Sequence, residues 1–378
     1  MSSFDLVVAG AGIVGLAHAL AATRRGLKVA LVERDSQARR SSVQNFGFVT
    51  LAGQAEGTTR LRVLRSREVW LEVAAAAGIP VLQRGALLVA RRAESLAVLE
   101  EYAATPSGAR CEMLSAATAR ERFAAASARI VGGLHSKDEL RVEARETVPA
   151  ILRWLEEAKG VTVYRGRAAL AIERKGLATD AGLIEADAVV VAPGSNVAAF
   201  APELAARTRA HDCRLQMLRI RAPSVELPSV VMGDLSFLRY EGFATLRSAA
   251  ALRERVAAEQ PKHVAAGVHV IVAQSADGSL VVGDSHRYER WPDAQRPARE
   301  AAERAEDETL ILEELAALAD TPGLEVIDRW TGVYPVADAK PLLAESPGPR
   351  ARVIAVTNGL GMSTGFAIGE ETIAELFG

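Results

Sequence analysis

The N-terminal stretch FDLVVAGAGIVGLAHALAATRRGLKVALVER constrains the fold of this chain more than any other segment. Its apolar run over residues 4–9 has the length and branching of a buried strand, and the alanine-rich run after it predicts a helix. A second apolar run then predicts a strand that closes in Glu33. The turn between the first strand and the helix has the spacing G-x-G-x-x-G, formed by Gly10, Gly12 and Gly15.

Each glycine of this turn has a mechanical role in a dinucleotide-binding unit. Gly10 permits the tight turn, Gly12 lets a pyrophosphate approach the backbone, and Gly15 lets the helix pack closely on the strand. The free N–H groups of the first helical turn face the phosphates. Glu33, followed by Arg34, is placed to accept hydrogen bonds from a ribose diol. Because strand, turn, helix, strand and acid occur within one window, we predict a dinucleotide-binding domain rather than a coincidental glycine turn.

Two later segments repeat the order of an apolar strand followed by a glycine turn. The first is EADAVVVAPGSNV, and the second, near the C-terminus, is RVIAVTNGLGMSTGFAIGEETIAELF. Two additional glycine turns are more than a nicotinamide cofactor needs, so the pattern favours the longer FAD. The residues that we expect to contact the cofactor at these turns are Ala192, Gly194, Gly359, Gly361, Met362, Ser363 and Thr364.

The order of these motifs resembles that of the D-amino-acid oxidase superfamily over nearly the whole chain, with glycine oxidase and sarcosine oxidase as the nearest familiar types. The resemblance also rests on the run Ser42-x-x-Asn45-x-Gly47 and on W-x-G-x-x-P at residues 330–335. It implies a Rossmann-type α/β domain that binds FAD, interrupted by an α+β substrate domain with a mixed, largely antiparallel sheet. Ser42, Asn45 and Gly47 would then lie near the pyrophosphate, the ribityl chain and the flavin ring.

The intervening segments support this interruption independently of the resemblance. We expect strands over 85–92, 217–223, 236–243 and 324–335, a hairpin over 269–290 that turns at ADGS, and a helix over 298–319. Strand-rich and nucleotide-type segments therefore alternate along the chain, which predicts discontinuous domains. We assign 1–80, 141–210 and 335–378 to the FAD-binding domain, and 81–140 and 211–334 to the substrate domain.

The cysteines predict how the cofactor is attached. Sarcosine oxidase relatives attach the flavin to a cysteine near the C-terminus, whereas Cys111 and Cys213 lie far upstream of that position. We therefore expect non-covalent FAD. The two cysteines also have no metal-ligand spacing, so we predict no metal site.

The motif RWTGVYPVAD, residues 329–338, is the segment most informative about the substrate. In glycine oxidase and D-amino-acid oxidases an arginine stands where this chain has Tyr334, and that arginine holds the substrate carboxylate in a two-pronged ion pair. Trp330 and the rest of the frame are kept, which indicates a changed substrate rather than a degenerate fold. Candidates to replace the lost arginine are Arg239, Tyr240, His286, Arg287, Tyr288 and Arg329.

This combination also resembles a branch of the superfamily associated with bacterial phosphonate catabolism. The resemblance implies FAD-dependent oxidation of a small primary or secondary amine, with hydride transfer to flavin N5 and hydrolysis of the imine. The best candidate substrate is 2-aminoethylphosphonate or its N-methyl derivative. This chemistry needs no obligatory base in the protein, and if a base exists, His286 is the candidate.

Several alternatives stay open. The chain could be a glycine, sarcosine or D-amino-acid oxidase, a 2-hydroxy-acid dehydrogenase that uses His286 as a base, or a non-catalytic flavin-binding subunit. Leu360 and Ser363 stand near positions where relatives carry a histidine and an oxygen-activating lysine. Either oxygen or another electron acceptor is therefore open.

The composition excludes other classes of function. A net charge of −2 and a pI near 6.4 predict no binding to nucleic acid. No apolar run reaches the 18 or so residues that a membrane span requires, and the N-terminus has no signal-peptide pattern. We therefore expect a cytoplasmic protein, with no membrane association and a homo-oligomer left open.

Overall fold

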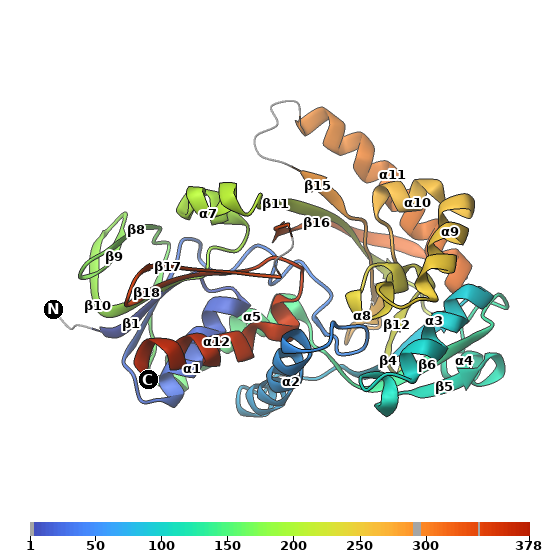
Figure 1. Ribbon diagram of the computed structural model, residues 1–378, viewed down its shortest axis with the longest axis horizontal. Coiled ribbons are helices and arrows are strands. Elements are labelled where there is room, and N and C mark those ends of the chain that lie inside the picture. Colours follow the sequence, from blue (N-terminus) through green and yellow to red (C-terminus); the bar gives the residue numbers. More distant parts are fainter. Residues whose placement is uncertain (1–3, 290–295, 339–340) are drawn as a thin grey trace.

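The computed structural model describes residues 4–289, 296–338 and 341–378, which form two sheets lying side by side (Figure 1). The strands of the first sheet follow the order β17-β18-β10-β1-β2-β7. Their bounds are β1 (Phe4–Ala9), β2 (Val29–Glu33), β7 (Thr162–Arg165), β10 (Gly182–Val191), β17 (Leu342–Gly348) and β18 (Ala351–Val356). The hairpin of β8 (Ala169–Glu173) and β9 (Gly176–Thr179) extends from β10.

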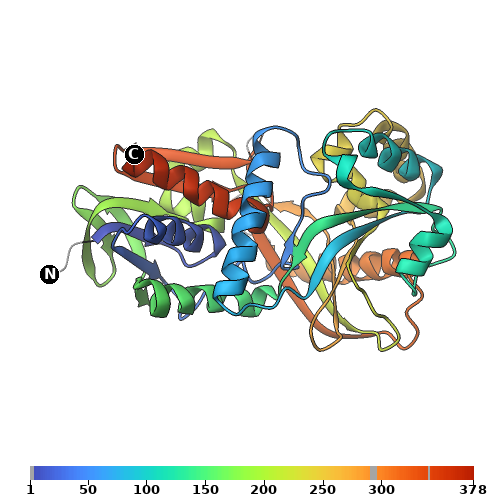
Figure 2. The ribbon, with the colours of Figure 1, turned by 90° about the horizontal axis from the view of Figure 1, so that it is seen from below.

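The first sheet has a parallel centre whose strands are buried on both faces, as near-continuous apolar runs require. Leu6 and Val8 face one side, where the helices α1 (Ile13–Arg24), α2 (Thr58–Ala76), α5 (Ala144–Lys159) and α12 (Gly361–Phe377) pack. Val7 and Ala9 face the other side and pack against the β8–β9 extension. Figure 2 shows these four helices in front of the sheet, with α2 running between the two halves of the molecule.

The second sheet is mixed and follows the order β15-β11-β14-β13-β12-β4-β6-β3, with β16 paired to β11 and β5 to β6. Its strands are β3 (Phe48–Val49), β4 (Gln83–Ala90), β5 (Glu112–Ser115), β6 (Gly132–Arg141), β11 (His211–Arg221), β12 (Val230–Met232), β13 (Ile271–Gln274), β14 (Leu280–Gly283), β15 (Arg287–Glu289) and β16 (Glu325–Val336). Alternate residues divide between its two faces: Ala86 and Leu88 pack toward one, Leu87 and Val89 toward the other.

Helices cover both faces of this sheet. The face of Leu88 is covered by α3 (Ala93–Ala103), α8 (Glu241–Ala244) and α9 (Ala249–Glu259), and the face of Val89 by α4 (Ala116–Arg122), α10 (Pro261–Ala266) and α11 (Arg296–Leu318). The remaining short helices are η1 (Gly108–Arg110), η2 (Gly194–Asn196), α6 (Val197–Phe200), α7 (Pro202–Arg207) and η3 (Asp234–Leu238). No helix within the described residues is long and apolar enough to cross a membrane.

The expected mixed α/β fold, the hairpin around ADGS and the long helix before RWTGVYP are confirmed. The strand expected over 236–243 is wrong, because that segment forms η3 and α8 instead. Its backbone groups are satisfied locally, since the N–H groups of Arg239 and Tyr240 both donate to the carbonyl of Ser236. Phe237 and Phe243 are buried from this helical path, which apolar content alone could not distinguish from a strand.

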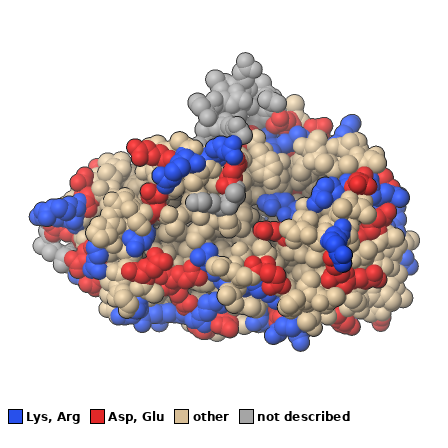
Figure 3. All heavy atoms as spheres, viewed as in Figure 1, with Lys and Arg blue, Asp and Glu red and all other residues tan. Residues whose placement is uncertain are grey.

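The proposed domain division stays a prediction, although most strands follow it. An exception is β3, which belongs to the second sheet through its pairing with β6 but falls inside the segment 1–80. Charges are interspersed in sign on the face drawn in Figure 3.

At Gly15, the contact of α1 with the first sheet leaves no room for a side chain. A Cβ there would lie 1.8 Å from the carbonyl oxygen of Gly10. We expect Gly15→Ala to separate α1 from β1, to destabilise the fold by about 1–3 kcal/mol, and to lower the FAD content of the purified protein. Differential scanning fluorimetry and absorbance at 450 nm measure both effects.

The matched control is Gly365→Ala on α12, where the nearest atom to an added Cβ is 3.8 Å away in ordinary contact. Equal stability and FAD content in the two variants would contradict this account of the helix–strand contact.

Candidate functional site

A cavity of about 580 Å³ runs from the end of β2 to the face of β16. Its lining comes from both sheets, so it joins the nucleotide-type turns of the first to the strands of the second. Glu33 lies at one end, and Tyr334 and Asp284 lie at the other.

The turn after β1 shapes the nucleotide end of the cavity. Gly10 has a φ of +103°, and a Cβ there would lie 2.5 Å from the carbonyl oxygen of Ala192. Only glycine suits that left-handed conformation and close approach. The side chain of Glu33 accepts hydrogen bonds from the N–H groups of Ala11, at 2.9 Å, and Asp35, at 3.1 Å. Its carboxylate is thereby fixed beside the N-terminus of α1.

The loop between β2 and β3 closes over this turn. Ser42 Oγ accepts a hydrogen bond from the N–H of Ile13 at 3.0 Å. Asn45 donates from Nδ2 to the carbonyl of Ser41 and accepts at Oδ1 from the N–H of Gly47, both at 2.7 Å. The asparagine therefore organises the loop through its own backbone as well as lining the cavity.

Most of the residues expected at the cofactor line this cavity. They are Gly10, Gly12, Gly15, Glu33, Arg34, Ser42, Asn45, Ala192, Gly194, Gly359, Gly361, Met362 and Ser363. Gly47 and Thr364 are not among the lining residues. Gly47 lies against the carbonyl of Val142, where a Cβ would approach to 1.7 Å, and Thr364 donates from its hydroxyl to the carbonyl of Leu360.

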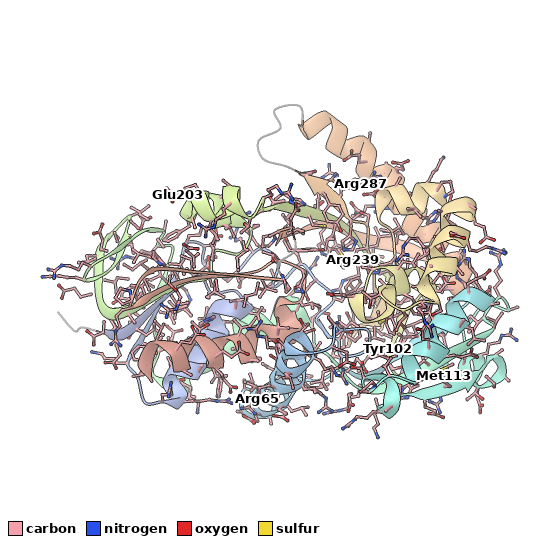
Figure 4. The ribbon with its side chains drawn as sticks, viewed as in Figure 1. Arg65, Tyr102, Met113, Glu203, Arg239 and Arg287 are labelled. Carbon is pink, nitrogen blue, oxygen red and sulfur yellow. The ribbon has the colours of Figure 1, made fainter. Side chains whose placement is uncertain are left out.

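At the opposite end an arginine meets the tyrosine of the W-x-G-x-x-P motif. Arg239 Nη2 donates to the Tyr334 hydroxyl at 2.9 Å. Arg239 Nε is buried and has no hydrogen-bond partner among the described residues. The guanidinium enters from the segment between η3 and α8, near the junction of the two halves (Figure 4). Arg239 thus supplies a cation next to Tyr334, the position at which the motif lacks an arginine.

Beside Arg239 lies a cluster of His269, Asp284 and His286, of which the sequence indicated only His286. His269 Nε2 is 3.2 Å and His286 Nδ1 is 3.8 Å from Asp284 Oδ1, and the two imidazole rings stack with centroids 5.0 Å apart. Burial raises the pKa of Asp284 to about 8, although the charge of Arg239 opposes this. Burial, helped by Arg239, lowers the pKa of His269 to about 3 and that of His286 well below its ordinary value.

Comparison with known proteins identifies a family for this chain. The chain matches the model of the DAO family, described as FAD dependent oxidoreductase, over residues 5–375. The chain belongs to that family. A search of curated protein sequences gives no significant match.

Solved structures share the fold of this FAD-dependent oxidoreductase. Glycine oxidase from Bacillus cereus has a TM-score of 0.76 at 16% identity, covering 99% of this chain and 97% of its own. L-proline dehydrogenase from P. horikoshii has a TM-score of 0.73 at 17% identity, covering 99% and 93%. L-α-glycerophosphate oxidase from Mycoplasma pneumoniae, solved with FAD bound, has a TM-score of 0.75 at 16% identity, covering 100% and 95%.

The nucleotide end of the cavity fits the FAD that the family requires. The N-cap residue of α1, Gly12, offers no side-chain cap, and Ser42 takes up only the N–H of Ile13, which leaves the other N–H groups of the first turn for a phosphate. At the far end, a Cβ on Gly359 would lie 3.3 Å from Cζ of Tyr334, so the glycine turn before α12 meets the substrate wall directly. Neither cysteine lines the cavity, and non-covalent attachment remains our prediction.

Of the expected substrate residues, Arg239, Tyr240, His286 and Tyr334 line the cavity. Trp330 does not, because its indole N–H donates to the carbonyl of Gln44 and its ring stacks under Arg145. Arg287 is held outside the cavity by an ion pair with Asp307, and Arg329 by an ion pair with Glu308. Arg287 is labelled in Figure 4. Tyr288 is also outside the lining and is 55% exposed.

Glu33 gives a direct test of the nucleotide end. We expect Glu33→Gln to raise the Kd for FAD roughly 10- to 100-fold, because hydrogen bonds to a charged group contribute about 1.5–3 kcal/mol. FAD fluorescence released on dilution measures this Kd. The control is Asp5→Asn, a half-buried acid at the opposite end of the β1–β2 pair that accepts from the N–H of Lys28. Unchanged FAD affinity in the Glu33 variant would contradict the assignment.

Proposed function

We propose that this enzyme oxidises a small primary or secondary amine that carries an acid group, with 2-aminoethylphosphonate or its N-methyl derivative as the best candidate. The observation that carries the proposal is the contact of Arg239 with Tyr334 in a cavity continuous with the cofactor end. The pair offers an acid group one permanent positive charge, since an arginine stays protonated at any ordinary pH.

The shape of this cation site favours a phosphonate. A planar carboxylate is bound best by a guanidinium that presents two parallel N–H groups. Here one Nη of Arg239 is directed to the Tyr334 hydroxyl, while Nε remains without a partner. Donors on different side chains, Arg239 Nε and the hydroxyl of Tyr334, suit the tetrahedrally arranged oxygens of a phosphonate.

The rest of the wall excludes water from the reacting carbon. Phe46, Phe48, Leu215 and Ile271 are buried apolar residues that line the cavity. Such surroundings favour the neutral form of an amine, which is the form that can be oxidised. Bound FAD would supply the chemistry by accepting a hydride from the carbon that bears the amine. The imine released would take up water, giving an aldehyde and ammonia from a primary amine, or an aldehyde and a primary amine from a secondary one.

The neutral histidines limit what acid–base chemistry the cavity can do. The pKa of His286 is lowered well below its ordinary value by burial and by Arg239, and its Nδ1 faces the carbonyl of Gly267 at 3.2 Å. A base of such low pKa accepts a proton poorly from an ammonium or a hydroxyl group. His286 is therefore better suited to shaping the cavity than to serving as the general base.

A second candidate is oxidation of an alcohol that carries an acid group. Among the structural neighbours, one is named for glycerophosphate, a phosphate-bearing alcohol, and others for glycine and L-proline. An alcohol needs a base to take the hydroxyl proton, and the low pKa of His286 counts against that role. Oxygen and other electron acceptors both remain alternatives. A homo-oligomer also stays open.

The flavin absorbance near 450 nm, followed under anaerobic conditions, tests the proposal. We expect 2-aminoethylphosphonate and its N-methyl form to bleach the flavin, and glycine, sarcosine and a 2-hydroxy acid to act at least tenfold more slowly. Faster bleaching by glycine or sarcosine would indicate that Arg239 binds a carboxylate. Bleaching by the 2-hydroxy acid alone would favour oxidation of an alcohol.

Substitutions at the cation site test how the acid group is bound. We expect Arg239→Met to lower kcat/KM for the best substrate roughly 10- to 100-fold, mainly through KM, because a charge-assisted hydrogen bond is lost. Tyr334→Phe should lower it about 2- to 10-fold. Steady-state kinetics with saturating acceptor measure both, and Arg329→Met, on the same strand as Tyr334, serves as the control. An unchanged KM in Arg239→Met would place the acid group elsewhere.

A further inference from the structure

Asp284 is a buried carboxyl at the open end of the β13–β14 hairpin. Its backbone pairs with His269 across the hairpin, N–H to carbonyl at 2.8 Å in one direction and 3.1 Å in the other. The side chain is 5% exposed and lines the cavity together with Arg239, His269 and His286. The hairpin therefore presents an acid to the same space into which Arg239 presents a cation.

One oxygen of the Asp284 carboxyl, Oδ1, lacks a hydrogen-bond donor among the described residues. Oδ1 accepts no hydrogen bond from the part of the chain that the structure describes, even though His269 Nε2 lies 3.2 Å away. The low pKa of both histidines keeps them neutral, so neither supplies a positive charge. The charge of Arg239 acts on Asp284 through space, while its Nη2 donates a hydrogen bond to Tyr334. Because burial raises the pKa of Asp284 to about 8, the carboxyl is protonated near neutral pH in the free protein, and ionising it there requires a positively charged donor from a ligand.

We infer that Asp284 binds the amino group of the substrate, so that the cavity recognises a zwitterion through Arg239 at its acid end and Asp284 at its amine end. This inference rests on the proposed function, because it assigns the second recognition group of the same substrate. It would also explain selection of amines over hydroxy acids, since a hydroxyl group lacks the positive charge that stabilises a buried carboxylate.

The same contact supplies a route for the proton that must leave before oxidation. An ammonium N–H proton passes to Asp284 Oδ1, which leaves a neutral amine and a protonated carboxyl and involves no change in oxidation state. The pKa of about 8 for Asp284 lies close enough to that of an alkylammonium group for this transfer to be accessible.

A metal ion is the competing occupant. His269, Asp284 and His286 could each offer one ligand atom, all within 4.8 Å of one another. His286 Nδ1 is, however, directed to the carbonyl of Gly267, and the positive charge of Arg239 acts on Asp284. Both features favour an ammonium group, which is held by a single acid, over a divalent cation that needs all three ligands.

The test compares two ligands that differ only in the amine. Calorimetry on the FAD-loaded protein, reduced with dithionite to prevent turnover, gives the Kd of 2-aminoethylphosphonate and of ethylphosphonate. We expect the wild-type protein to bind the aminophosphonate at least tenfold more tightly. Asp284→Asn should weaken the aminophosphonate roughly 10- to 100-fold and change ethylphosphonate less than threefold. The control is Asp277→Asn, at the closed end of the same hairpin, where the acid accepts from Ser279.

Several outcomes would overturn the inference. One is equal affinity of the wild-type protein for the two ligands, which needs no variant to fold. Another is an Asp284→Asn protein of normal FAD content whose affinities for the two ligands equal those of the wild type, or are both lowered by the same factor. Loss of turnover after dialysis against EDTA and recovery with Zn²⁺ would assign the cluster to a metal. If no amine reduces the wild-type flavin, the proposed function itself fails, and that result is separate from all of these.

Discussion

The parallel centre of the first sheet is the constraint on which the rest of the site depends. Because β1, β10 and β18 are parallel and adjacent, their carboxyl ends meet at one edge, and the three glycine turns that follow them meet there too. The contact of Gly15 with the carbonyl of Gly10 brings the N-terminus of α1 to this edge. Segments from the two ends of the chain thus form one nucleotide site.

The second sheet extends that nucleotide site into a cavity that can also hold a substrate. Pairing of β16 with β11 places Tyr334 against Gly359, so the last glycine turn of the first sheet meets the wall of the second. The hairpin β13–β14 adds Asp284, and the segment after η3 adds Arg239. In our account the cation of Arg239 and the acid of Asp284, set in an apolar cavity, select a small zwitterion and exclude water from its amine.

Local patterns predicted the parts of the structure that depend on short-range order. The G-x-G-x-x-G turn, the ADGS hairpin and the long helix before RWTGVYP each carry their signal within a few residues. The contact of Arg239 with Tyr334 joins residues 95 positions apart, so only the missing arginine in the motif pointed to it. His269 and Asp284 gave no signal, because their proximity comes from register across the hairpin. Trp330 and Arg287 had suitable chemistry, but strand geometry and ion pairs with α11 direct them elsewhere.

The most direct test of the central claim is a crystal structure of the dithionite-reduced, FAD-loaded protein with 2-aminoethylphosphonate bound. Our account predicts phosphonate oxygens in hydrogen-bond contact with Arg239 and Tyr334, and the nitrogen against Asp284 Oδ1. A ligand bound in the reverse orientation, or with its phosphonate held by residues of the nucleotide end such as Arg34, would contradict it.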